Sequence, residues 1–190
     1  MAGHPFRVLA PADATGPLRP TDLVIGGSAF GAGTHPTTAS CLELLAVLAP
    51  LDGLRVLDLG SGSGILGIAA LRLGAAAALC ADVNPDAVES ARRNGIANGV
   101  DDRLDHRLAG ARDLAGAGPF DLVVANIGGE ILLDDAARIA PLARDGGRLL
   151  LSGLLRAWTD ELEAAYARLG CTVLDRRFPG AFTTALLRRG

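Results

Sequence analysis

The stretch from Arg55 to Gly64 constrains the fold of this chain more than any other. It begins with a short apolar run that carries an acid, Arg55-Val56-Leu57-Asp58-Leu59, and continues with glycine at every second position, as Gly60, Gly62 and Gly64. A buried parallel strand that runs into a glycine turn and then a helix has this pattern. Glycine lets the backbone bend sharply and lets a ligand approach closely. The turn is therefore predicted to lie at the carboxyl end of a strand, where open α/β sheets bind ligands.

The next apolar run supports a ligand at this turn. Ala78-Leu79-Cys80-Ala81-Asp82 ends in an acid, about 20 residues after the glycines, which is the separation at which a carboxylate can hydrogen-bond a ribose diol. The glycine spacing is G-x-G-x-G, which differs from the G-x-G-x-x-G of the dinucleotide fingerprint. Such a turn alone also fits a tight bend without a ligand. The two features together predict a cofactor that contains a nucleoside.

The composition limits the class of protein. A length of 190 residues predicts one domain, and a net charge of −3 gives no basic footprint for nucleic acid. The three cysteines, Cys41, Cys80 and Cys171, are widely spaced and fit buried thiols in a reducing compartment, with no metal site. No apolar run approaches the ~20 residues that span a bilayer, and no signal peptide is evident. We therefore expect a cytoplasmic protein without a membrane segment, a metal or direct nucleic-acid binding.

Strand and helix patterns alternate along most of the chain. Residues 1–22 are rich in proline, glycine and alanine and are expected to form an irregular lead-in with at most one short strand. Residues 23–190 are expected to form one domain. Alternation of this kind predicts an α/β fold with a mostly parallel sheet and helices on both faces. The Pro179-Gly180 turn makes the last two strands antiparallel, because a parallel crossover needs about a dozen residues or more. The expected strands are 54–59, 78–82, 103–108, 120–126, 147–152, 171–178 and 182–188, with a strand or buried connector at 23–25, and the expected helices are 37–49, 64–73, 85–97, 131–143 and 157–169.

Several motifs resemble those of the ribosomal protein L11 methyltransferases, which are class I methyltransferases that use S-adenosylmethionine (SAM). The loop at 29–38 is similar to the loop that opens that family's catalytic domain, and residues 56–66 resemble its cofactor turn. Residues 81–100 are similar to the family's ribose segment. Residues 124–127 resemble its Ala-Asn-Ile motif, and residues 151–155 resemble its Leu-Ser-Gly-Ile-Leu motif. The resemblance covers residues 24–189. It implies a Rossmann-like fold with a seven-stranded sheet and a C-terminal antiparallel hairpin, SAM as cofactor, and N-methylation of an L11-like protein.

The resemblance also implies roles for individual residues. Gly60, Gly62 and Gly64 would let the backbone pass close to the methionine part of SAM, and Asp82 would accept both ribose hydroxyls. Asn126 would accept hydrogen bonds from the amine and so hold its lone pair towards the methyl group. A strand-end asparagine that closes a turn is the alternative for Asn126.

The loop before the first long helix is expected to form a polar lid near the cofactor. Thr34 and Thr37 belong to it, and either threonine is expected to cap the helix. His35 fits a general base, but a histidine that packs or caps the loop is favoured, because it has no triad partner at a recognisable spacing.

Two further residues each have two expected roles. Asp58 would face the ammonium group of SAM or cap the amides of the glycine turn. Asn84 would contact the cofactor or cap the helix that begins at Pro85, and the cap is favoured. The adenine contact is left open, because neither Asp105 nor Asp113 is well placed by the sequence.

Other functions stay open because the chain departs from the family. Relatives carry an N-terminal substrate-recognition domain, which the residues before 24 are too few to supply. A small-molecule or peptide N- or O-methyltransferase is therefore an alternative. A non-catalytic module that binds SAM or a nucleotide is the alternative of another class. A nicotinamide oxidoreductase is disfavoured by the glycine spacing and the antiparallel tail.

Overall fold

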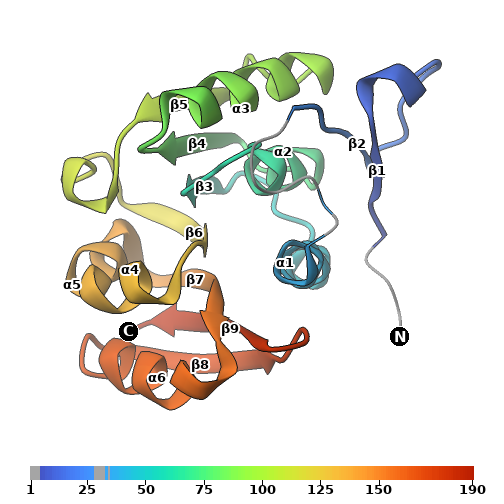
Figure 1. The fold of residues 1–190 in the computed structure, drawn as a ribbon. Helices are drawn as coiled ribbons and strands as arrows, with labels where there is room; N and C mark the ends of the chain where they lie inside the picture. The colour runs from blue at the N-terminus through green and yellow to red at the C-terminus, as the bar shows by residue number, and fades with distance from the viewer. Residues whose placement is uncertain (1–4, 28–32, 34) are drawn as a thin grey trace.

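The computed structural model describes residues 5–27, 33 and 35–190 of the chain. Seven strands form one mixed sheet in the order β5-β4-β3-β6-β7-β9-β8, with helices over both faces (Figure 1). Strands β3 to β7 pair in parallel, and β9 is antiparallel to both β7 and β8. The expected fold class is confirmed. The strands are β3 (Arg55–Leu59), β4 (Ala77–Asp82), β5 (Leu104–Leu108), β6 (Phe120–Asn126), β7 (Ala143–Leu155), β8 (Cys171–Arg177) and β9 (Phe182–Arg189).

Six α-helices lie within the described residues, and short 3-10 turns connect several elements. None of these helices is long and apolar enough to cross a membrane. The helices are α1 (Pro36–Leu48), α2 (Ile65–Arg72), α3 (Pro85–Ala97), α4 (Gly129–Asp134), α5 (Ala136–Ile139) and α6 (Thr159–Ala167), and the 3-10 turns are η1 (Pro11–Asp13), η2 (Ala111–Asp113), η3 (Ala140–Leu142) and η4 (Arg156–Trp158).

Successive residues of the central strands enter two separate cores. Val56 and Val124 pack with α1, α2 and α3, whereas their neighbours Leu57 and Val123 pack with α4, α5 and α6. Side chains of a strand alternate between the two faces of the sheet. Because both faces are covered, both sets of residues are apolar, which explains why these strands read as continuous apolar runs.

One predicted helix is wrong in its extent. Residues 131–143 were expected to form a single helix, but the structure has α4, α5 and the turn η3 there, and β7 already begins at Ala143. Pro141 lies in η3, and proline disrupts a helix interior because it lacks the backbone N–H and clashes with the preceding turn. Strand β7 also extends beyond the expected 147–152, because Ala143 pairs with Phe120 of β6 and Leu155 pairs with Phe182 of β9.

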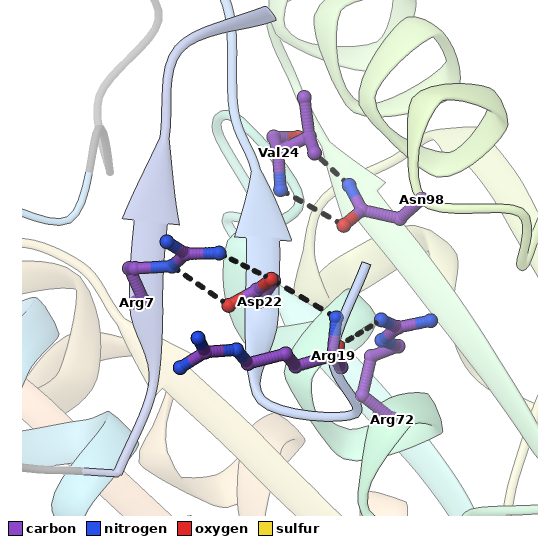
Figure 2. A network of polar contacts seen from close by, with 6 residues as sticks. All are labelled: Arg7, Arg19, Asp22, Val24, Arg72 and Asn98. Carbon is purple, nitrogen blue, oxygen red and sulfur yellow. Dashed lines mark hydrogen bonds and ion pairs between the residues drawn. The ribbon is translucent and has the colours of Figure 1, made fainter. Parts of the chain in front are cut away.

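The N-terminal segment forms a small sheet of its own. Strands β1 (Arg7–Leu9) and β2 (Asp22–Val24) pair in parallel beside α2 and α3 (Figure 1). Figure 2 shows the bidentate contact from the Arg7 guanidinium to the buried Asp22 carboxylate, at 2.9 and 2.7 Å. The side chain of Asn98 accepts a hydrogen bond from Val24 N at 2.9 Å and donates one to Val24 O at 2.7 Å. The Arg7 contact joins β1 to β2, and the two Asn98 hydrogen bonds fasten β2 to the end of α3.

Candidate active site

A cleft of about 780 Å³ lies at the carboxyl ends of β3, β4, β5 and β6. The chain runs outward from β3 to β4 and β5, and then returns to the other side of β3 as β6. Such a reversal of strand order is where open α/β sheets bind ligands. The cleft is lined by the glycine turn after β3, the end of β4, residues 109–113 and the segment that follows β6. Its position agrees with the sequence-based expectation.

The three glycines of the turn have left-handed backbone conformations but different surroundings. Gly60 and Gly62 line the cleft. A Cβ on Gly60, whose φ is +67°, would lie 2.1 Å from Cγ2 of Ile127. Gly64 begins α2 as its N-cap, and a Cβ there would lie 2.9 Å from Cβ of Ala91 on α3. The first two glycines therefore face the cleft, whereas Gly64 allows α2 and α3 to approach each other.

Asp82 lines the cleft at the end of β4. Its Oδ2 accepts a hydrogen bond from Gly62 N at 2.9 Å, and its Oδ1 accepts one from Asn84 N at 2.9 Å. A carboxylate has about four lone-pair positions, so each oxygen can accept a further hydrogen bond. Asp82 therefore fixes the glycine turn and still offers acceptors to a ligand in the cleft.

Asp58 is buried behind the turn and is not among the residues that line the cleft. Its Oδ2 accepts a hydrogen bond from Gly67 N in the first turn of α2, at 2.8 Å. Burial raises the pKa of Asp58 to about 7, although the Gly67 hydrogen bond opposes the shift. The amide that this hydrogen bond caps belongs to α2 and not to the glycine turn, where the cap was expected.

Asn84 caps α3 next to the cleft. Oδ1 of Asn84 accepts a hydrogen bond from Asp86 N at 2.9 Å, which confirms the expected N-cap of α3. Asn84 is exposed and is not a lining residue.

Helix α1 has His35 as its N-cap, and the expected threonine cap is wrong. Nδ1 of His35 accepts a hydrogen bond from Thr37 N at 3.4 Å and lies 2.7 Å from Thr37 Oγ1. Pro36 at the first helical position fixes where α1 begins. Both His35 and Thr37 line the cleft, as expected for the polar lid, whereas Thr34 lies outside the described residues.

Asn126 ends β6, lines the cleft and is only 8% exposed. Its Nδ2 donates a hydrogen bond to Thr38 Oγ1 at 3.3 Å. Its Oδ1 is buried and accepts no hydrogen bond within the described part of the chain. An unsatisfied buried polar atom costs about 1–3 kcal/mol, so an atom of this kind beside a cleft is a candidate acceptor for a ligand.

The segment after Asn126 is held between two glycines. Gly60 contacts the side chain of Ile127, as described above. On the other side, a Cβ on Gly153, whose φ is +95°, would lie 2.2 Å from the carbonyl oxygen of Ile127. Ile127 N also donates to Ser152 O at 3.0 Å. The backbone beyond Asn126 is therefore fixed between the glycine turn and β7.

The sequence analysis missed the apolar and charged residues that the loops contribute to the cleft. Val83, Ala109 and Ala111 give one wall an apolar surface, and Phe182 of β9 meets the His35 ring edge-on, with ring centroids 5.2 Å apart. Their positions directly after β4 and β5, or at the start of β9, are the signal that could have indicated them.

The acidic candidates for an adenine contact behave differently. Asp113 lines the cleft, and its Oδ2 accepts from Gly110 N at 2.9 Å. Asp105 lies within β5 opposite Leu79 and is not a lining residue. Farther along the wall, Arg112 Nε lies 3.3 Å from Oδ1 of Asp135, which joins the loop after β5 to the junction of α4 and α5.

No cluster of three metal-ligating side chains occurs among residues 5–27, 33 and 35–190.

Sequence comparison finds that the chain is similar to ribosomal protein L11 methyltransferases. The family model for ribosomal protein L11 methyltransferase (PrmA) matches residues 8–179. A ribosomal protein L11 methyltransferase of Ectopseudomonas mendocina (strain ymp) is 50% identical over 145 residues, which are 76% of this chain and 49% of that protein. One from Salmonella newport (strain SL254) is 48% identical over 143 residues, which are 75% and 48% of the two chains. The chain thus spans about half the length of the curated relatives it matches.

Structural comparison agrees. A ribosomal protein L11 methylase from Lactobacillus delbrueckii subsp. bulgaricus superposes with a TM-score of 0.82 at 29% identity, covering 96% of this chain and 94% of that one. A magnesium protoporphyrin IX methyltransferase from Synechocystis PCC 6803, solved with bound SAM, shares the fold with a TM-score of 0.70 at 19% identity, covering 87% and 86% of the two chains. The resemblance seen in the sequence is confirmed, and the chain belongs to the ribosomal protein L11 methyltransferase family.

Proposed function

We propose that this chain is a SAM-dependent methyltransferase that acts on an amine. The observation that carries the proposal is the buried Oδ1 of Asn126, which accepts no hydrogen bond from the described residues and belongs to a residue of the cleft wall. Family membership supports the same activity.

The residues around the cleft fit SAM by their chemistry. The carboxylate of Asp82 suits a ribose diol, because it has free acceptor positions on both oxygens. Gly60 and Gly62 present backbone without side chains, which leaves room for the amino-acid part of the cofactor. The apolar wall at Val83 and Ala109 suits an adenine ring. When bound, SAM would supply a methyl group on a sulfonium sulfur: a nitrogen that attacks the methyl carbon forms the N–C bond as the S–C bond breaks, and S-adenosylhomocysteine leaves with that electron pair.

The remaining residues hold this arrangement in place. Asp58 accepts from Gly67 N and so joins β3 to the first turn of α2, while Gly64 and Asn84 shape the starts of α2 and α3. Thr37 lines the cleft, and Thr34 and Thr37 are proposed as cofactor contacts. In this proposal Asp58, Gly64 and Asn84 act through the backbone of the site.

Asn126 is proposed to position the methyl acceptor. The hydrogen bond to Thr38 fixes the Nδ2 end of the amide, which leaves Oδ1 to accept an N–H from an amine. A neutral amine that donates one N–H to this oxygen keeps its lone pair for the methyl carbon. Orientation of this kind accelerates transfer without a covalent enzyme intermediate.

Ribosomal protein L11 is the first candidate acceptor, because the matched relatives are named for it. A small molecule or a peptide with an amine is the second candidate acceptor. Residues 23–190 are proposed to be the methyltransferase domain, with residues 1–22 as its lead-in.

Calorimetric titration with SAM and S-adenosylhomocysteine tests the cofactor. Asp82→Ala is expected to weaken binding about 10- to 100-fold, because hydrogen bonds to a charged group contribute about 1.5–3 kcal/mol. Asp86→Ala is the matched control, since Asp86 is an exposed acid four residues farther along that does not line the cleft. Absence of binding by the wild-type chain, or equal effects of the two variants, would contradict the proposal.

Methyl transfer to L11 and to small amines tests the acceptor role of Asn126. Asn126→Ala is expected to lower kcat while the Kd for SAM stays within about threefold of the wild type. Ser152→Ala serves as the control, because Ser152 pairs with Asn126 across β6 and β7 but does not line the cleft. A chain that binds SAM but transfers no methyl group to any acceptor would be a binding module.

A further inference from the structure

Asn94 lies on α3, and its side chain connects two segments that are distant in the sequence. Its Oδ1 accepts a hydrogen bond from Gly26 N at 2.9 Å. Its Nδ2 donates to Ser63 O at 2.9 Å and to Gly26 O at 3.3 Å. The residue is only 4% exposed; its hydrogen bond to Ser63 O is buried, and its two hydrogen bonds to Gly26 are partly buried.

Both segments lead to the cleft. Ser63 belongs to the glycine turn, two of whose residues line the cleft. Gly26 follows β2, and the chain beyond it leads to His35 and Thr37, which form another part of the cleft wall. The side-chain amide of Asn94 therefore links the glycine turn, through Ser63, to Gly26.

We propose that Asn94 is a positioning residue that couples the glycine turn to residues 24–27, so that a ligand on the turn also stabilises these residues. This inference rests on the proposed function, because the ligand on the turn is SAM or its product. Such coupling is a free energy shared between two sites, and each site therefore responds to a change at the other. Asparagine suits the role because its short side chain both donates and accepts.

Asn98, the C-cap residue of α3, provides a matched comparison four residues farther along the chain. It is 3% exposed, and its described hydrogen bonds go to Val24 N, Val24 O and Asn94 O. Figure 2 shows how it holds the backbone of β2. Asn98 thus fastens the same N-terminal segment with the same chemistry, but its described hydrogen bonds do not reach the glycine turn.

The test uses Asn94→Asp and Asn98→Asp in the full chain. Each change keeps the side-chain shape and the acceptor oxygen, but removes an NH₂ group that donates to two carbonyls. Hydrogen exchange is followed on a peptide that covers residues 22–27, with and without saturating S-adenosylhomocysteine, and calorimetry gives the Kd of each variant. A structural role alone would lower protection equally in the two variants and would leave the response to ligand unchanged.

We expect the ligand to slow exchange at residues 22–27 about three- to tenfold in the wild type and in Asn98→Asp, the range that corresponds to one hydrogen bond. In Asn94→Asp the ligand is expected to bind more weakly, and at saturation to leave exchange in this peptide unchanged. A ligand response that persists in Asn94→Asp, or that is absent from a wild-type chain that binds the ligand, overturns the inference. A wild-type chain that binds no ligand overturns the proposed function instead. If Asn94→Asp does not fold, Asn94→Ala and Asn98→Ala replace the pair, because they place no charge in the interior.

Discussion

The side chains of Asn126 and Thr38 join the end of β6 to the first turn of α1 through a hydrogen bond of 3.3 Å between Nδ2 and Oγ1. Both residues are buried, and Thr38 is 0% exposed. This hydrogen bond orients the NH₂ group of Asn126 towards Thr38. The side-chain oxygen is therefore the atom that can accept an N–H from the amine that receives the methyl group.

Thr38→Val is expected to lower kcat for methyl transfer about three- to tenfold while leaving the Kd for SAM unchanged. Valine keeps the branched shape but removes the hydroxyl that orients Asn126, which corresponds to the loss of one hydrogen bond. Ser40→Ala is the control, since Ser40 is also buried on α1 and its hydroxyl has no hydrogen-bond partner among the described residues. An equal loss of kcat in the two variants would refute the orienting role of Thr38.

Gly60→Ala and Gly153→Ala are both expected to destabilise the protein, but only the first should respond to a second substitution. The new methyl group at position 60 meets the Ile127 side chain, whereas at position 153 it meets the Ile127 carbonyl. Ile127→Ala should therefore restore part of the stability of Gly60→Ala and none of that of Gly153→Ala. Gly180→Ala is the control for the positive φ alone, because nothing lies within 4 Å of its Cβ position, and its cost should stay near ~1 kcal/mol. Chemical denaturation measures the free energy of unfolding of Gly60→Ala and Gly153→Ala, of each combined with Ile127→Ala, and of Gly180→Ala.

Asp58→Asn is expected to remove a pH dependence of stability. Burial raises the pKa of Asp58 from 3.8 to about 7 in the folded protein, so folding favours the protonated carboxyl. The wild type should therefore lose stability relative to Asp58→Asn as the pH rises from about 4 to about 7, by up to ~1.4 kcal/mol per pH unit, and the difference should be constant above that range. Unfolding free energies of both proteins between pH 4 and 8 test this. A difference that does not change with pH would show that Asp58 is ionised in the folded state throughout.

Asp22→Asn is expected to have the opposite pH dependence. Hydrogen bonds from Arg7 and from Arg19 N lower the pKa of Asp22 from 3.8 to about 2. The stabilisation that ionised Asp22 provides is therefore fully present above about pH 4 and is lost as the pH falls through 2. Urea unfolding of the wild type and the variant should give a constant difference above pH 4 that shrinks towards pH 2. A difference that stays the same at pH 2 would mean that the Arg7 contact does not depend on the charge of Asp22.

The sequence alone predicted the main strands along the chain, the antiparallel tail, and Asp82 and Asn126 as strand-end residues that face the cleft. These features depend on local properties. Apolar runs form strands covered on both faces, and glycines at 60 and 62 adopt backbone conformations that other residues disfavour. The single helix expected at 131–143 is wrong because Pro141 lies within that range, in η3, and a proline disrupts a helix interior.

Tertiary packing decided which polar residues face the cleft. Asp58 and Asp82 both lie near the ends of neighbouring strands, but Asp58 is covered by α2 through Gly67, whereas Asp82 opens onto the cleft. Asn94 meets Gly26 and Ser63 across separations of 68 and 31 residues. A local pattern cannot specify such contacts, because they exist only after the sheet has brought α3, the glycine turn and the N-terminal strand together.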